Sequence, residues 1–172
     1  MRITFTRYSR VMMALHWATA ALVVAAYLLS EGGRHIRVHP PLLHFACGLA
    51  VLVLLVPRLI ARALGGAPPL QQHGDRRWLL AARTVHVLLY LLLLAVPIIG
   101  WYVASQLGLP AWLFGITLPP LTAAVPGPAG ILAQVHQVGG NLILILAGVH
   151  ALAALWHHFG MRDSTLRRMV PF

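Results

Sequence analysis

The sequence is dominated by four long apolar stretches, which cover residues about 11–29, 42–64, 79–105 and 131–159. An α-helix rises about 1.5 Å per residue, so each stretch can cross a hydrocarbon core of about 30 Å. Only helices and closed barrels satisfy their backbone in lipid, and these stretches are too long and too uniformly apolar for barrel strands. The pattern predicts an all-α fold, an integral membrane four-helix bundle that forms a single domain over residues 1–172.

The connection between the last two stretches, residues 106–130, carries no charge and contains five prolines. Trp112 and Phe114 in this connection suit a membrane–water interface. We therefore expect an ordered outer cap that lies on the membrane surface. Within the third stretch, Pro97 and Gly100 predict a kink.

Charge determines the expected orientation. The formal net charge is +10, from thirteen arginines, no lysine and three acidic residues. Most arginines fall at the N-terminus, in the second connection and at the C-terminus: Arg2, Arg7, Arg10, Arg58, Arg62, Arg76, Arg77, Arg83, Arg162, Arg167 and Arg168. The positive-inside rule then places both termini in the cytoplasm. This placement also argues against nucleic acid as the partner of the basic chain, and for the lipid bilayer.

The first thirty residues imitate a signal peptide, with basic residues followed by an apolar run. The run is long enough to span and contains His16 and Trp17, so we expect it to remain as the first helix. Cys47 is the single cysteine, which excludes an internal disulfide, and the sequence contains no Cys-x-x-Cys-His motif for covalent haem attachment.

Four histidines of the apolar stretches lie at depths where they can pair two by two across the membrane: His16, His44, His136 and His150. His136 and His150 are fourteen residues apart, which places them about 21 Å apart along one helix and about 40° off one face. In the expected topology His16 and His150 share the inner leaflet, and His44 and His136 share the outer leaflet. Each pair can supply both axial ligands of a haem b. The pattern therefore predicts two stacked haems and electron transfer across the membrane.

Small residues follow each of these histidines by four positions, on the same helix face: Ala20, Gly48, Gly140 and Ala154. A porphyrin that lies against a helix needs such neighbours. A single intramembrane histidine often only hydrogen-bonds another helix. Four histidines at matched depths favour the haem interpretation.

Other histidines leave alternatives open. His86 lies in the inner half of the third stretch and is a candidate to replace His16 as a ligand, to contact a propionate or a quinone, or to serve packing. His157 and His158 end the fourth stretch, either as interfacial residues or as part of a proton-coupled quinone site. Their position near the inner haem makes them candidates to contact a ligand of that haem or a quinone.

Arginines near the helix ends are candidates to pair with haem propionates. Arg58 and Arg62 lie beside the expected inner site, where topology alone also explains them. The first connection carries an outer cationic patch that opposes the positive-inside bias, made of Arg34, His35, Arg37 and His39. Such a patch would attract small anions or an acidic redox partner.

These residues resemble the bacterial cytochrome b561 family of four-helix dihaem membrane proteins. The matching stretches are residues 7–10, 15–17, 44–48, 53–58, 86–100, 114–119, 136–141, 149–158 and 165–171. The resemblance implies a multi-pass electron carrier of the bacterial inner membrane, with ligands at His16, His44, His136 and His150. It also implies electron exchange with the ubiquinone pool, as acceptor or donor, and in some members oxidation of superoxide at the periplasmic face.

Three functions compete at this level. The first is a stand-alone oxidoreductase that passes electrons from superoxide or a periplasmic redox protein to ubiquinone. The second is a cytochrome b anchor and electron conduit of a larger periplasmic enzyme, similar to the subunits of hydrogenases or formate dehydrogenases. The third is a haem-free helical module such as a metal transporter or sensor, which the lack of carboxylates in the apolar stretches disfavours.

Overall fold

A computed structural model describes residues 7–30, 38–65, 76–128 and 130–170 of the chain. Its elements are α1 (Arg10–Leu28), α2 (Leu42–Gly65), α3 (Arg76–Gln106), β1 (Ala111–Leu113), β2 (Ile116–Leu118), α4 (Ile131–Phe159) and the 3-10 turn η1 (Leu166–Arg168). All four predicted spans are confirmed as long apolar helices. The largest difference in their bounds is that α3 begins at Arg76 instead of residue 79.

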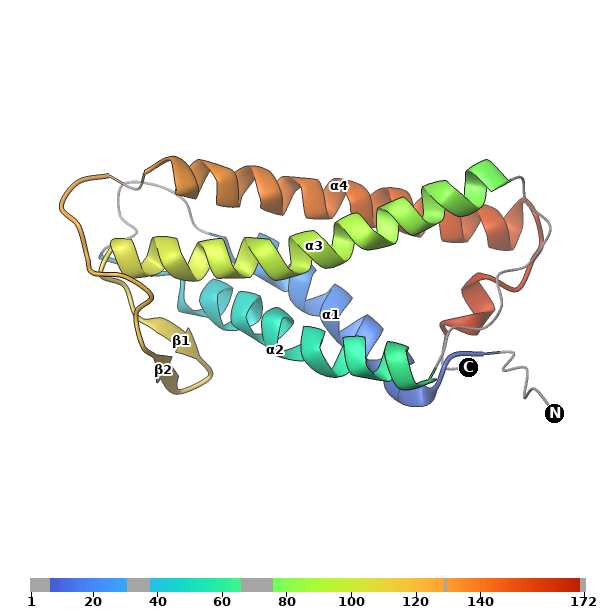
Figure 1. Ribbon diagram of the computed structural model, residues 1–172, viewed down its shortest axis with the longest axis horizontal. Coiled ribbons are helices and arrows are strands. Elements are labelled where there is room, and N and C mark those ends of the chain that lie inside the picture. Colours follow the sequence, from blue (N-terminus) through green and yellow to red (C-terminus); the bar gives the residue numbers. More distant parts are fainter. Residues whose placement is uncertain (1–6, 31–37, 66–75, 129, 171–172) are drawn as a thin grey trace.

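The helices form a bundle in which α1 packs on α2, α2 on α3, and α3 on α4 (Figure 1). Large apolar side chains cover the outside of this bundle: Val53, Leu91 and Ile145 are each more than half exposed. Such an extensive apolar surface marks contact with lipid rather than water. The composition of the helices thus explains both their helical state and their place in a membrane.

The packed interior is small. Its centre is a cluster of Val51, Leu55 and Leu93, against which Leu22, Val23 and Tyr90 pack. Along α2 this cluster falls between His44 and Arg58. It therefore separates the two ends of the bundle, where the polar side chains of the interior gather.

Local sequence features explain how the helices begin and approach one another. The Ser9 hydroxyl caps α1 by accepting a hydrogen bond of 3.2 Å from the backbone N–H of Met12. Pro97 lies inside α3, which is visibly bent in Figure 1, as the predicted kink requires. A Cβ at Gly139 of α4 would lie 2.6 Å from a methyl carbon of Val96, so glycine permits close approach of α3 and α4.

The connection after α3 differs in one respect from the expected cap, because it contains a β-hairpin that the sequence analysis did not predict. Strands β1 and β2 are antiparallel, and Leu113 pairs with Ile116. Phe114 and Gly115 between them have positive φ angles of 44° and 98°, which suits the tight turn of a two-residue hairpin. The two strands are only three residues each, too short for the alternating pattern to stand out.

Hydrogen bonds fix this connection onto the end of α3. The Trp101 Nε1–H donates to the carbonyl of Pro119 at 3.2 Å. The buried Ser105 hydroxyl accepts from the backbone N–H of Leu121 at 3.0 Å and donates to the carbonyl of Trp101. An ordered cap thus lies at one end of the bundle, which we call the hairpin end.

The opposite end, which we call the terminus end, holds the start of α1 and the segment after α4 (Figure 1). The backbone N–H of Tyr8 donates to the carbonyl of Arg168 at 3.1 Å. The Trp17 Nε1–H donates to the carbonyl of Met169 at 2.9 Å. These contacts bring the beginning and the end of the described chain together on one side of the membrane.

Candidate cofactor site

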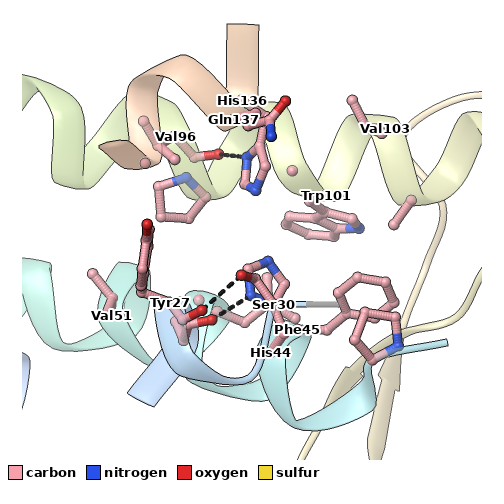
Figure 2. Close-up of a pocket in the computed structure, with 18 of the residues that line it drawn as sticks. Tyr27, Ser30, His44, Phe45, Val51, Val96, Trp101, Val103, His136 and Gln137 are labelled. Atoms are coloured by element: carbon pink, nitrogen blue, oxygen red, sulfur yellow. Dashed lines mark hydrogen bonds between the residues drawn. The ribbon is translucent and has the colours of Figure 1, made fainter. Parts of the chain in front are cut away.

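At the hairpin end, His44 of α2 faces His136 of α4. Their ring centroids are 5.8 Å apart and the ring planes are nearly perpendicular, at 83°. Figure 2 shows the two rings pointing toward each other across a cavity, with Trp101 beside them. We call these two residues the hairpin-end pair.

Each ring of the hairpin-end pair is oriented by a backbone carbonyl. His44 Nδ1 bonds the carbonyl of Ala26 at 2.7 Å, and His136 Nδ1 bonds the carbonyl of Val96 at 3.0 Å. Since a carbonyl only accepts, each Nδ1 carries the proton, and Nε2 of each neutral ring keeps its lone pair. A histidine that binds a metal is held in this way, with the second nitrogen donating to the protein.

The cavity between these rings has a volume of about 660 Å³, within the range of cofactor pockets, roughly 300–1,000 Å³. Gly48 and Gly140 line it, and a Cβ added at either would meet no protein atom within 4 Å. An imidazole binds a metal at about 2 Å, so two rings on opposite sides of one ion have centroids about 6 Å apart. The hairpin-end pair and its glycines therefore fit a planar cofactor with a central metal.

Gly100 of α3 has a role that the sequence analysis did not identify, since it was considered only for a kink. A Cβ at this position would lie 2.6 Å from Cε1 and 2.9 Å from Nδ1 of His136. Glycine is therefore needed for the His136 ring to lie against α3 and reach the carbonyl of Val96. In the sequence, the nearby Pro97 already suggested a kink as the reason for this glycine, so its contact with His136 was not predicted.

At the terminus end, His16 of α1 faces His150 of α4, with ring centroids 6.3 Å apart and planes at 73°. We call these the terminus-end pair. Nη2 of Arg58 donates to Nδ1 of His16 at 2.9 Å. A guanidinium has no acceptor, so His16 Nδ1 accepts in this arrangement and the proton of the neutral ring lies on Nε2, whereas both Nδ1 atoms of the hairpin-end pair donate. For Nε2 of His16 to bind a metal, Arg58 must release Nδ1, which then carries the proton.

Arg58 lies on the same stripe of α2 as His44, because fourteen residues separate them, leaving only about 40° between their directions. The guanidinium carbon lies 5.3 Å from the centre of the Tyr90 ring. Its Nε is buried and has no hydrogen-bond partner among the described residues. A buried donor without an acceptor indicates that an additional acceptor, such as a carboxylate, belongs here.

His86 of α3 is the third ring at this level, with its centroid 5.0 Å from that of His150. The structure thus brings together both candidates for the second ligand. The separation of 6.3 Å between His16 and His150 is closer to the spacing that a metal between two rings requires. Arg62, one turn beyond Arg58, is exposed at the end of α2.

The end of α4 carries a second polar cluster. His157 Nδ1 lies 2.6 Å from Oδ2 of Asp163, and the Thr165 backbone N–H donates to Oδ1 at 2.8 Å. Partial burial acts to raise the pKa of Asp163, but the hydrogen bonds from Thr165 and His157 outweigh it and hold that pKa below its usual value. His158 Nδ1 is buried without a partner in the part of the chain that the structure describes. Sequence reasoning named both histidines but missed Asp163, which is adjacent only through the turn after α4.

The expected outer cationic patch lies mostly outside the described residues. This holds for Arg34, His35 and Arg37, so the patch remains a prediction. His39, its fourth member, is described and is exposed before the start of α2, at the hairpin end.

Comparison with known proteins identifies the family. The family model described as prokaryotic cytochrome b561 matches residues 7–172. The chain is 34% identical to "Probable superoxide oxidase CybB" of Yersinia pestis over 170 residues, which cover 96% of each protein. It is 35% identical to "Cytochrome b562" of Cereibacter sphaeroides over 95% of this chain and 94% of that protein. It is 32% identical to "Cytochrome b561 homolog 2" of Escherichia coli K12, over 95% and 91%.

The chain belongs to the prokaryotic cytochrome b561 family. The expectation drawn from its motifs is confirmed. Together with the four long apolar helices, the family makes it a multi-pass protein of the bacterial inner membrane that transfers electrons. The family also implies haem b as its cofactor.

Proposed function

We propose that this member of the prokaryotic cytochrome b561 family is a dihaem cytochrome b that carries electrons from a periplasmic donor to the ubiquinone pool. The supporting observation is the presence of two facing histidine pairs, with ring separations of 5.8 and 6.3 Å, at the two ends of one bundle. His136 and His150 belong to the same helix, which supports two stacked sites at depths about 21 Å apart. This spacing suits one haem in each leaflet.

Each proposed ligand has a stated role. His44 and His136 would bind the haem at the hairpin end, and His16 and His150 the haem at the terminus end. When bound, each haem would supply an iron that accepts and releases single electrons. Arg58, whose buried Nε lacks a partner among the described residues, is the candidate for a propionate of the terminus-end haem.

The arginine distribution supports an orientation with the terminus end in the cytoplasm. The terminus end holds the arginines at the end of α2 and at the start of α3, which are Arg58, Arg62, Arg76 and Arg77. The hairpin end, with its uncharged cap, would then face the periplasm. Electrons would enter at the hairpin-end pair and leave at the terminus-end pair.

Superoxide is the proposed donor. The support is the name of the Yersinia pestis relative, at 34% identity, together with the predicted cationic patch at the hairpin end, of which His39 is exposed. Two superoxide anions each lose one electron and become two molecules of oxygen. The two electrons, with two protons from the cytoplasmic side, convert one ubiquinone into ubiquinol.

The polar cluster at the end of α4 is the proposed place of quinone reduction. His157 is bonded to the Asp163 carboxylate at 2.6 Å, and the pair can hold and transfer a proton at Nε2 of His157. His158 adds a buried ring nitrogen that lacks a partner in the described chain. The cluster begins seven residues after His150 on the same helix, or about 10 Å along the axis.

The first experiment is a reduced-minus-oxidised spectrum of the purified protein with a measured haem-to-protein ratio. Two low-spin b haems per chain are expected, and a ratio of one or zero would overturn the dihaem proposal. Variants His16→Ala and His86→Ala then identify the second ligand at the terminus end. We expect His16→Ala to lose one haem and His86→Ala to keep both.

The donor is tested separately by mixing the oxidised protein with superoxide. The resulting spectrum is compared with that of the fully reduced protein. Reduction of the haems by superoxide should be fast and should slow as salt screens the patch. No reduction above the buffer background would remove superoxide from the proposal. If the protein is purified in native lipid and a periplasmic enzyme co-purifies with it in stoichiometric amount, the electron-conduit function is favoured instead.

A further inference from the structure

The two histidine pairs differ in the groups that contact their Nδ1 atoms. At the hairpin end, two neutral carbonyls accept from His44 and His136 at 2.7 and 3.0 Å. At the terminus end, a cationic guanidinium lies 2.9 Å from the Nδ1 of His16. Both haems would be of the same type with the same kind of ligands, so this difference must act on their potentials.

The two kinds of contact act on an iron in opposite directions. A carbonyl that accepts from a ligating imidazole makes the ring a stronger donor and stabilises the oxidised, more positive iron. A cation beside the ring disfavours the oxidised iron by charge repulsion and stabilises the reduced state. The first lowers the midpoint potential and the second raises it.

The structure holds the charge of Arg58 in place. The guanidinium lies 5.3 Å from the centre of the Tyr90 ring, and its Nε is buried. Asp163 is the one acidic residue in the described ranges, and it is bonded to His157. Arg58 is therefore a partly buried cation that no carboxylate of the described chain neutralises.

We infer that the terminus-end haem has the higher midpoint potential of the two, and that Arg58 is the residue that raises it. The inference rests on the proposed dihaem function and gives it a direction, because electrons then fall from the hairpin end to the terminus end. A neutral His16 that binds iron through Nε2 carries its proton on Nδ1, so Arg58 would give up its bond to that atom and turn its guanidinium, including the unpaired Nε, to a haem carboxylate. Removal of the cation then leaves the site more negative.

The test is a spectroelectrochemical titration of the purified holoprotein and of the variants R58Q, R58K and R62Q. The unaltered protein should show two one-electron transitions. R58Q should decrease the reduction equilibrium constant of the high-potential haem about tenfold, which shifts its midpoint potential down by about 59 mV. The midpoint potential of the low-potential haem should not change. R58K keeps the charge and should retain most of the potential. R62Q removes an exposed arginine one turn away and should shift the same transition less, because solvent screens its charge.

The outcomes are exclusive. If R58Q moves the lower transition, or neither, the inference is wrong. If R58Q loses a haem instead, disappearance of the upper transition supports the inference and disappearance of the lower one overturns it. A single transition in the unaltered protein overturns the inference. A haem-to-protein ratio of one would then overturn the dihaem proposal as well, whereas a ratio of two would leave that proposal standing. Failure of superoxide to reduce the haems removes only the donor and leaves both potentials as they are.

Discussion

Replacing Gly140 by leucine tests whether a planar cofactor fills the cavity between His44 and His136. A Cβ at Gly140 meets no protein atom within 4 Å, although the glycine lies in the middle of α4. The open space has a simple explanation if the face of a porphyrin lies against this position. A leucine side chain would then enter the volume that the cofactor occupies.

The expected magnitude follows from the two states of the site. Without a cofactor, the leucine finds room and gains about 0.5–1 kcal/mol of helix propensity over glycine. With the cofactor bound, the added side chain overpacks a cavity of about 660 Å³, at a cost of about 1–3 kcal/mol. That cost corresponds to a roughly 5- to 150-fold weaker binding of the hairpin-end haem. The terminus-end haem should be unaffected.

The assay is a titration of haem into haem-depleted protein, followed by the difference spectrum, with circular dichroism as a check on folding. Gly148→Leu is the matched control. A Cβ at Gly148 also meets nothing within 4 Å, but this glycine is exposed and lies about 120° around α4 from His136. The control should gain the same helix propensity and bind both haems normally.

Equal haem affinities in Gly140→Leu and Gly148→Leu would refute the assignment of the cavity to a cofactor. If Gly140→Leu lost only the terminus-end haem, the assignment of Gly140 to the hairpin-end haem would be wrong. Loss of helix content in Gly140→Leu would mean that the open space at this position is filled by protein, and the reasoning from the glycine would be wrong.

Four further predictions rest on individual contacts and on one backbone angle. Gly100→Ala should destabilise the protein by about 1–3 kcal/mol, because its Cβ would lie 2.6 Å from the ring of His136; thermal unfolding measures this, and an unchanged midpoint contradicts it. Asp163→Asn should weaken the bond to His157 by about 1 kcal/mol, so that the segment after α4 exchanges amide hydrogens roughly fivefold faster. The pKa of Asp163 is lowered in the fold, so in the unaltered protein the same contact should be intact at neutral pH and weaken only in acid, as the pH falls below about 4. Gly115→Ala places a side chain at a φ of 98° and should cost about 1–2 kcal/mol locally at the hairpin, with both haems retained in the difference spectrum.

The sequence by itself determined the helices. Each apolar run is long enough to span a bilayer as a helix, and it is too long and too uniformly apolar for a strand of a closed barrel, so the number, type and approximate bounds of the spans followed directly. Helical geometry also determined depth, which is why His16 could be matched with His150 and His44 with His136 before any fold was known. In the structure these residues do face one another.

Only the tertiary structure decided what surrounds each ring. Periodicity defines the face and the height of a side chain, but not which neighbouring helix it meets. That Arg58 bonds His16, that Gly100 makes room for His136, and that Asp163 bonds His157 are consequences of helix contacts and a turn. The β-hairpin was missed because its order comes from contacts with α2 and α3 rather than from its own short strands. Residues distant along the chain set these environments, and local physics in the sequence cannot specify them.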